Sequence, residues 1–349
     1  MSHMKAVGYI KSLPISEAES LMDIELPMPI ASGRDVLVQV RAIAVNPVDY
    51  KIRLNVPSAN GEPKVIGWDA VGEVVATGEL VSNFKTGDVV YYAGDLNRQG
   101  SNAEYQLVDE RIVGFKPKSL SNAEAAALPL TTITAWELLF ERLTIKQQKP
   151  VAIEKTNEVL LVTGAAGGVG SILIQLAKAI TGATVIATAS RESSIKWVKQ
   201  LGADYVVDHT KPLAPQIAEL VKHEGIAPVS HIASLNGTEA YFDSYIELLA
   251  PFGKIALIDD PSEPLDVMKL KPKSQSIHFE LMYTRSMFQT PDMAEQSKLL
   301  NRVAELIDTG YVKTTVGQNF GRISAVNLRT AHELLETGQA IGKVVLEDF

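Results

Sequence analysis

A glycine-rich segment is the part of the chain whose residue types and spacing point most directly to chemistry. Residues 159–162 form an apolar run, residues 164–170 read Gly-Ala-Ala-Gly-Gly-Val-Gly, and apolar residues then recur at helical spacing over residues 169–180. Glycines let the backbone approach a pyrophosphate without a clash from Cβ, and the amides at a helix N-terminus favour an anion. A strand, a turn and a helix in this order predict a dinucleotide site.

The turn departs slightly from the usual G-x-G-x-x-G pattern. Aligned on it, the first glycine is replaced by Ala165, while the other two are Gly167 and Gly170. A tight turn without a ligand is the alternative interpretation, and the strand and helix on either side favour binding. The residues predicted to contact the cofactor here are Ala166, Gly167, Gly168, Val169 and Gly170.

The end of the second strand indicates which dinucleotide is bound. A carboxylate there would bind the ribose 2′-hydroxyl of NADH, but the sequence has Ser190 and Arg191. Serine can donate a hydrogen bond and arginine can pair with a 2′-phosphate, so NADPH is the predicted cofactor. Lys196 and His209 are further candidate contacts. Glu192 weighs against this prediction, and a solvated surface charge is the alternative for Arg191.

Two kinds of element are expected to position these residues. From residue 5 to about 107, short apolar runs alternate with turn residues, which is typical of a mostly antiparallel β domain. From residue 159, apolar strands start 21 to 26 residues apart with amphipathic helices between them, which predicts a doubly wound parallel sheet. We therefore expect an α/β chain with residues 1–130 and 276–349 in a catalytic domain and 131–275 in a nucleotide-binding domain.

Composition excludes several classes of function. The 349 residues carry 33 Lys and Arg against 41 Asp and Glu, a net charge of −8, which argues against nucleic acid as a partner. The chain has no cysteine, which excludes disulfides, thiolate nucleophiles and cysteine-ligated metals. The N-terminal residues contain no apolar targeting segment, and the apolar stretch 159–180 is interrupted by glycine and polar residues, so we expect a cytoplasmic protein without a membrane span.

These residues, together with the segments 46–53 (Asn-Pro-Val-Asp-Tyr-Lys-Ile-Arg), 66–72 (Ile-Gly-Trp-Asp-Ala-Val-Gly) and 100–105 (Gly-Ser-Asn-Ala-Glu-Tyr), resemble the medium-chain dehydrogenase/reductase superfamily. More narrowly, the chain is similar to the zinc-free quinone oxidoreductase branch, often labelled zinc-type alcohol dehydrogenase-like. The resemblance covers nearly the whole chain. It implies a GroES-like catalytic domain, a Rossmann domain, and assembly as a homodimer or homotetramer.

The resemblance also implies that no catalytic metal is bound. Zinc members carry a cysteine near the position of Asn46 and a Gly-His-Glu where this chain has Gly67, Trp68 and Asp69. Both ligands are missing, which disfavours alcohol oxidation that depends on a Lewis acid. A metal-dependent alcohol dehydrogenase that uses carboxylates such as Asp49 and Asp69 is a less favoured alternative.

Family positions supply candidate catalytic residues. Thr134 matches a threonine near the nicotinamide, Asn46 and Lys51 match a segment that faces the cofactor, and Lys343 matches a lysine that contacts the cofactor. Lys51 could polarise a carbonyl. A solvated surface position is the alternative for both lysines, and no general acid is assigned.

Four further residues match loops that line the family's substrate site. They are Tyr92, Tyr283, Arg285 and Phe288, and the alternative for the aromatic ones is a place in the core. We expect reduction of a quinone or an α,β-unsaturated carbonyl by NADPH, because conjugation delocalises the charge that develops on the acceptor oxygen. The alternative from another class is a non-catalytic protein that binds or senses NADPH.

Overall fold

A computed structural model describes residues 2–349 and divides the chain into two compact units. The first unit comprises the residues up to Ile133 together with Tyr283–Phe349, and the second comprises Thr134–Met282. The sequence placed these boundaries a few residues earlier, at 130/131 and 275/276. Among the described residues, no helix has the length and apolar character needed to cross a membrane.

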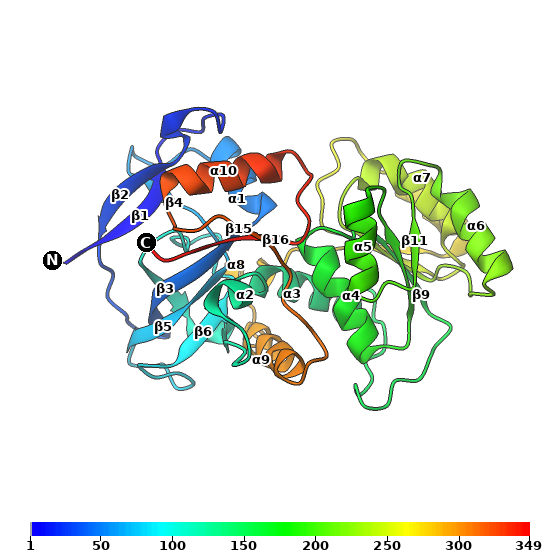
Figure 1. Cartoon of the computed structure of the whole chain (residues 1–349), viewed down its shortest axis with the longest axis horizontal. Coiled ribbons are helices and arrows are strands. Elements are labelled where there is room, and N and C mark those ends of the chain that lie inside the picture. Colours follow the sequence, from blue (N-terminus) through cyan, green and yellow to red (C-terminus); the bar gives the residue numbers. More distant parts are fainter. Residues whose placement is uncertain (1) are drawn as a thin grey trace. The chain divides into compact units, whose positions relative to one another are not determined.

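The first unit is built on mostly antiparallel sheets, as the short strands separated by turn residues predicted, and the pair β15–β16 is parallel. A three-stranded sheet has the order β2-β1-β4, and a larger sheet has the order β15-β16-β3-β5-β6-β8, with β7 also paired to β3 (Figure 1). The strands are β1 (His3–Tyr9), β2 (Met22–Pro27), β3 (Asp35–Val45), β4 (Lys64–Val65), β5 (Ala70–Thr77), β6 (Val89–Tyr92), β7 (Tyr105–Asp109), β8 (Val113–Phe115), β15 (Val316–Asn319) and β16 (Lys343–Glu347).

Helices cover these sheets and connect their strands. Asn46 begins α1 with a capping box, in which its backbone amide donates to the Asp49 carboxylate at 2.8 Å, and a proline follows at the first helical position. The capping residues therefore fix where β3 ends and the helix begins. The helices of this unit are α1 (Pro47–Asn55), α2 (Asn122–Ala126), α8 (Thr284–Met287), α9 (Glu295–Asp308) and α10 (Ala325–Glu336), and α3 (Pro129–Trp136) spans the boundary.

The C-terminal strand β16 completes the first unit. It pairs antiparallel with β3, with Val345 opposite Ala44, so the red and blue ends of the chain lie side by side in Figure 1. The return of the tail to the N-terminal sheet matches the interrupted arrangement expected from the sequence. The longest strand of the unit is thus held by segments from both ends of the chain.

The second unit contains one parallel sheet of six strands in the order β11-β10-β9-β12-β13-β14. Its central strands are wholly buried and apolar, as expected for a sheet covered on both faces. The elements are β9 (Val159–Thr163), α4 (Gly168–Ile180), β10 (Thr184–Thr188), α5 (Glu192–Gln200), β11 (Tyr205–Val207), α6 (Leu213–His223), β12 (His231–Ser234), α7 (Thr238–Leu248), β13 (Lys254–Leu257) and β14 (Ser276–Phe279).

The edge strand β14 lies beyond the predicted end of this domain at residue 275. Its four residues are half-buried or exposed, so it lacks the continuous apolar run that marked the other strands. The sequence pattern therefore gave no sign that the parallel sheet continues past Pro272.

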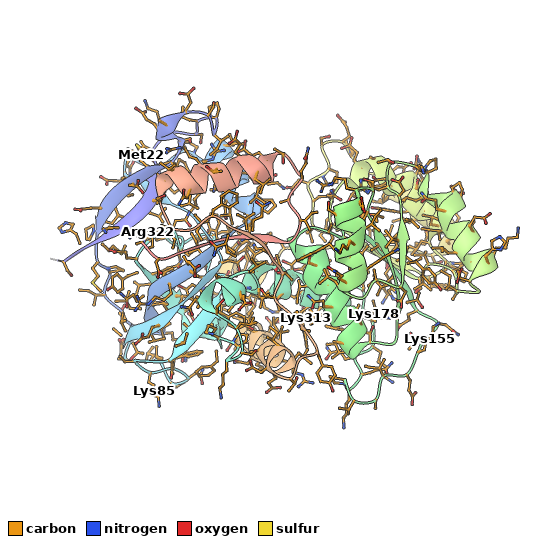
Figure 2. All side chains as sticks on the ribbon, in the orientation of Figure 1. Met22, Lys85, Lys155, Lys178, Lys313 and Arg322 are labelled. Atoms are coloured by element: carbon orange, nitrogen blue, oxygen red, sulfur yellow. The ribbon has the colours of Figure 1, made fainter. Side chains whose placement is uncertain are left out.

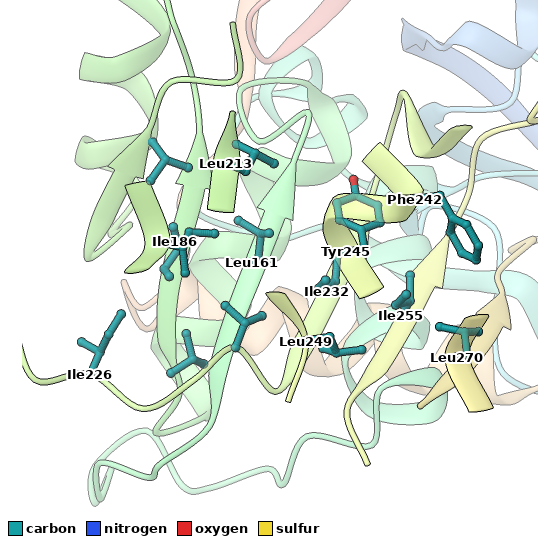
Figure 3. Close-up of a cluster of buried hydrophobic side chains, with 14 residues drawn as sticks. Leu161, Ile186, Leu213, Ile226, Ile232, Phe242, Tyr245, Leu249, Ile255 and Leu270 are labelled. Carbon is teal, nitrogen blue, oxygen red and sulfur yellow. The ribbon is translucent and has the colours of Figure 1, made fainter. Parts of the chain in front are cut away.

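Apolar packing and surface ion pairs hold the second unit together. Figure 3 shows the buried cluster in which Leu161 and Ile186 of the sheet meet Leu213, Phe242 and Leu249 of the helices and their ends. On the outside of the unit, Lys178 of α4, labelled in Figure 2, pairs with Asp204 at 2.9 Å, just before β11.

Candidate functional site

The glycine turn of the second unit follows β9 at the carboxyl end of the parallel sheet. Gly164 has a φ of +64°, and a Cβ atom there would lie 2.8 Å from the Asn236 side-chain oxygen. The sequence alignment started the motif at Ala165, but the structure gives the left-handed conformation to Gly164 and buries Ala165. The sequence feature that indicates this left-handed residue is a glycine directly after Thr163, the last residue of the strand.

The other two glycines of the motif, Gly167 and Gly170, have different surroundings. A Cβ at Gly170 would lie 2.4 Å from the Ala165 carbonyl oxygen, so this glycine allows the helix to pack closely on the turn. At Gly167, the N-cap of α4, the atom nearest to an added Cβ is the Gly164 carbonyl oxygen at 3.4 Å, which is an ordinary van der Waals contact, so this position is less crowded than Gly164 or Gly170. Ala166, Gly168 and Val169 are half-buried around this start of a 13-residue helix. The turn therefore fits a pyrophosphate.

The residues predicted to choose the dinucleotide lie at the ends of the next two strands. Ser190 follows β10 and His209 follows the neighbouring strand β11, and the Ser190 hydroxyl lies 3.4 Å from Nε2 of His209. Arg191 is exposed at the N-cap of α5, and Lys196 is exposed within that helix. A hydroxyl, an imidazole and a guanidinium from adjacent segments make a surface suited to a phosphate.

The order of the strands places the glycine turn and the residues that follow β10 and β11 at the same end of the sheet. From the central strand β9 the chain crosses to β10 on one side, whereas β12 lies on its other side and leads to β13. Ligands of open α/β sheets bind at the carboxyl ends of strands where the order reverses in this way. The glycine turn and Asn236, which follow β9 and β12, border this point.

A buried polar cluster occupies the first unit around the start of α1. Nζ of Lys343 donates to Asp69 at 2.9 Å, to the Val45 carbonyl at 3.1 Å and to Oδ1 of Asn46. Asn46 also donates from Nδ2 to Asp69 at 2.8 Å, and the Leu130 amide donates to the other Asp69 oxygen at 2.7 Å. Both oxygens of Asp69 accept hydrogen bonds, which is the pattern of an ionised carboxylate.

Two buried side chains at this cluster keep a polar atom without a partner among residues 2–349. They are Asp49, through Oδ1, and Tyr283, through its hydroxyl. Burial raises the pKa of Asp49 to about 7, against the amide of Asn46 and the charge of Lys343. Burial raises the pKa of Tyr283 well above its usual value, and the nearby carboxylates of Asp49 and Asp69 add to this. The Tyr283 ring packs edge-on against Trp68, with 6.3 Å between the ring centres.

The three predicted catalytic residues belong to two different units of the chain. Asn46 belongs to the buried cluster, whereas Lys51 is exposed on α1 of the same unit. Thr134 is buried in α3 and falls in the second unit. The side-chain oxygen of Asn46 accepts from Lys343 and its amide donates to Asp69, and the predicted catalytic role of Asn46 remains a prediction.

Lys343, which is predicted to contact the cofactor, is buried and uses its ammonium group within the first unit. Its side chain is 3% exposed, and its three N–H groups have the three acceptors named above. An ammonium group has only three donors, so none is left for a cofactor phosphate. The sequence could not show these contacts, because the three partners lie 274 to 298 positions away in the chain.

The four predicted substrate residues fall into two groups. Tyr92 and Tyr283 are buried, and the Tyr92 hydroxyl donates to Gln106 at 2.9 Å, so Tyr92 is a core residue rather than part of a surface that could meet a substrate. Arg285 is partly buried and pairs with Asp292 at 3.0 Å, while Phe288 is 72% exposed.

The residues at the cluster do not fit a zinc ion. Among residues 2–349, no three His, Cys, Asp or Glu side chains are placed so that they could hold a metal. At the positions of the zinc ligands of related enzymes stand Asn46, which binds Lys343, and Trp68, whose indole N–H donates to the Asp95 carbonyl at 3.1 Å. The Lys343 ammonium thus binds the Asn46 side chain that stands at the first of these positions, and an indole stands at the second.

Comparisons with known proteins agree with this two-part architecture. The family described as "Alcohol dehydrogenase GroES-like domain" matches residues 32–125, and the family described as "Zinc-binding dehydrogenase" matches residues 168–302. The zinc-type alcohol dehydrogenase-like protein of Staphylococcus aureus strain MSSA476 is 42% identical over 98% of this chain and 99% of its own. The chain belongs to the medium-chain dehydrogenase/reductase superfamily. As a member of this superfamily it is an oxidoreductase.

Other members of the superfamily carry more specific names. The 2-methylene-furan-3-one reductase of Solanum lycopersicum is 32% identical over 99% of this chain and 79% of its own. A Rhizobium etli structure with the provisional name of zinc-dependent alcohol dehydrogenase has a TM-score of 0.94 and 51% identity, covering 100% of this chain and 99% of its own. The quinone oxidoreductase of Coxiella burnetii (TM-score 0.81, 27% identity) and mycobacterial Rv1454c in complex with NADPH (0.80, 26%) each cover 99% of both chains.

Proposed function

We propose that this member of the superfamily is a zinc-independent, NADPH-dependent reductase of quinones or α,β-unsaturated carbonyls. The observation that carries the proposal is the buried ammonium of Lys343, which is bound by Asn46 and Asp69, two positions that the resemblance aligns with the ligand segments of zinc members. An ammonium nitrogen has no vacant orbital, so it cannot replace a metal as a Lewis acid toward an alcohol. An acceptor that needs no metal is the chemistry that remains.

The choice of NADPH is supported by the second unit. Ser190, Arg191, Lys196 and His209 offer hydrogen-bond donors and positive charge at the ends of β10 and β11, with no carboxylate at the end of β10. Rv1454c, which has the same fold, is described in complex with NADPH. These residues would hold the 2′-phosphate, while the amides from Ala166 to Gly170 would hold the pyrophosphate.

When bound, NADPH supplies the hydride, and the chain supplies binding, orientation and a hydrogen-bond donor. The acceptor's conjugated system spreads the charge that develops on its oxygen, so one donor suffices to stabilise it. Lys51, exposed on α1, is our candidate for that donor, and Thr134 is our candidate for orienting the nicotinamide. The names of the tomato and Coxiella relatives match this class of acceptor.

The test is a panel of quinones, enones and simple alcohols, assayed by NADPH or NADP⁺ absorbance before and after treatment with a chelator. We expect reduction of at least one conjugated acceptor, an unchanged rate after chelation, and no oxidation of alcohols. NADPH binding without turnover of any acceptor would instead support the non-catalytic alternative. Alcohol oxidation that is lost with the chelator and restored by zinc would support the metal-dependent one. Assembly as a homodimer or homotetramer remains a prediction.

A further inference from the structure

A chain of hydrogen-bonded side chains runs across the carboxyl end of the parallel sheet in the second unit. The Thr163 hydroxyl lies 3.1 Å from that of Tyr245, which lies 2.9 Å from that of Ser234, which in turn lies 2.7 Å from that of Thr238. Thr238 then donates to the Asp259 carboxylate. The four hydroxyl residues are buried, at 0 to 1% exposure, and Asp259 is half-buried.

The Asp259 end fixes the direction of every hydrogen bond in the chain. Thr238 gives its single hydroxyl hydrogen to Asp259, so it must accept from Ser234. Ser234 must then accept from Tyr245, and Tyr245 from Thr163. Tyr245, Ser234 and Thr238 therefore each donate one hydrogen bond and accept one, and Thr163 donates at the start of the chain. Satisfied hydroxyls are the favourable state for polar groups in a buried network.

The chain of hydroxyls connects the ends of three neighbouring strands. Thr163 is the last residue of β9 and directly precedes Gly164, Ser234 is the last residue of β12, and Asp259 follows β13. Asp259 also accepts the Thr238 backbone amide at 2.8 Å at the start of α7. These three strand ends border the point where the strand order reverses, which is the place expected for a dinucleotide.

Tyr245 is the central link of this network. Its ring belongs to the apolar cluster in Figure 3, among Ile232, Leu249 and their neighbours, and its hydroxyl is the polar atom that reaches the network. A ring held by close packing gives the hydroxyl a fixed position. Without that hydroxyl, Thr163 would lose its 3.1 Å partner and would retain only the Asn236 carbonyl at 3.5 Å.

We propose that Tyr245 is a positioning residue for dinucleotide binding, which holds the Thr163–Gly164 turn in register with the ends of β12 and β13 without touching the cofactor. This inference rests on the proposed function, because it presupposes that the turn binds a nicotinamide dinucleotide. The turn would contact the pyrophosphate that NADPH and NADH share. Its displacement should therefore weaken both cofactors equally.

The experiment compares Tyr245→Phe and Ser234→Ala with the wild-type chain, using fluorescence titration with NADPH and with NADH and steady-state kinetics. We expect the Kd for both cofactors to rise about tenfold in each variant, while kcat at saturating NADPH stays within about twofold of wild type. The ratio of the two Kd values should not change, since the network lies away from the residues that choose between the cofactors.

Ser230→Ala is the matched control. Ser230 lies at the amino end of the same strands, where its hydroxyl accepts from the Val159 amide at 2.9 Å. A general loosening of β9 and β12 would raise the Kd in both serine variants, which would overturn the positioning role. Wild-type Kd values in a folded Tyr245→Phe variant, verified by thermal melting, would also overturn it. Failure of the wild-type chain to bind either cofactor would instead contradict the proposed function.

Discussion

The ammonium of Lys343 lies 2.9 Å from the Asp69 carboxylate, and the two side chains are 3% and 0% exposed. Asp69 precedes β5 in the N-terminal segment of the first unit, and Lys343 begins β16 in its C-terminal segment. Burial removes both charges from water, and the added hydrogen bonds from Asn46 and Leu130 offset part of that cost. The ion pair therefore joins the two segments, and neither charge can be removed alone without penalty.

Replacing Lys343 by methionine should destabilise the protein by about 3–5 kcal/mol, because Asp69 would remain as a buried carboxylate without a countercharge. Urea unfolding gives the measurement. The double variant Lys343→Met, Asp69→Leu should recover part of the loss. Lys178→Met is the control, since its pair with Asp204 is about one-third exposed on each side and should contribute less than about 1 kcal/mol. Equal losses of unfolding free energy in Lys343→Met and Lys178→Met would contradict a stabilising role for the buried ion pair.

Arg191→Glu should shift the cofactor preference from NADPH toward NADH by about tenfold or more, because a carboxylate would repel the 2′-phosphate and can bind a ribose hydroxyl. The ratio of the Kd values for the two cofactors is the measurement. Lys199→Glu makes the same change of charge in the last turn of α5 and should leave the ratio unchanged. If the ratio is also unchanged in Arg191→Glu, this arginine lies outside the cofactor site.

Asp49 should make the folded state less stable as the pH rises. Its pKa is raised to about 7 by burial from a usual value of 3.8, so the folded state binds the proton more tightly than the unfolded state does. The contribution to stability is thus complete below pH 4 and lost as the pH rises toward 7. Asp49→Asn keeps an oxygen to accept the Asn46 amide and removes the titration.

The expected gain in stability for Asp49→Asn, relative to wild type, is on the order of 4 kcal/mol at pH 8 and close to zero at pH 4. Unfolding midpoints measured across this range supply the comparison. A difference that does not depend on pH would show that Asp49 titrates normally in the folded chain.

His332 should make the folded state more stable as the pH rises, which is the opposite of the effect of Asp49. Burial and the positive charge of Arg53 lower its pKa to about 3 from 6.5, so the unfolded state binds the proton more tightly. Its contribution to stability is present above pH 6.5 and lost as the pH falls toward 3. His332→Gln keeps an acceptor for Nε of Arg53, which lies 3.4 Å from Nδ1 of the imidazole, and should make the acid unfolding curve shallower. A curve as steep as that of wild type would count against this role.

Local patterns in the sequence were enough to predict the fold class. The apolar runs of the parallel strands and the helical periodicity after Gly168 appear in the structure as β9 to β13 and α4. Strand β14 was missed because its residues are only partly buried, and the left-handed conformation of Gly164, one residue before the aligned motif begins at Ala165, was not predicted. The pairing of β14 and the conformation of Gly164 both depend on contacts of a short segment with residues distant in the sequence.

The candidate site was harder to predict, because its geometry depends on contacts between distant residues. Nothing near Lys343 in the sequence shows that its ammonium is bound by Asn46 and Asp69, and Tyr92 does not differ in local pattern from a residue that lines a pocket. The link from Tyr245 to Thr163 joins positions 82 residues apart. Such contacts follow from packing, which a single sequence does not display.

The pairing of β16 with β3 also sets an order of events during protein synthesis. The second unit is one continuous stretch, Thr134–Met282, so all of its strands have left the ribosome before β16 has been translated. The large sheet of the first unit cannot be completed until Lys343–Glu347 has been synthesised and pairs with β3. During that interval β7 can cover residues 35–39 of this edge, but residues 42–45 have no strand partner, so the nascent chain exposes a short edge on which another chain could pair.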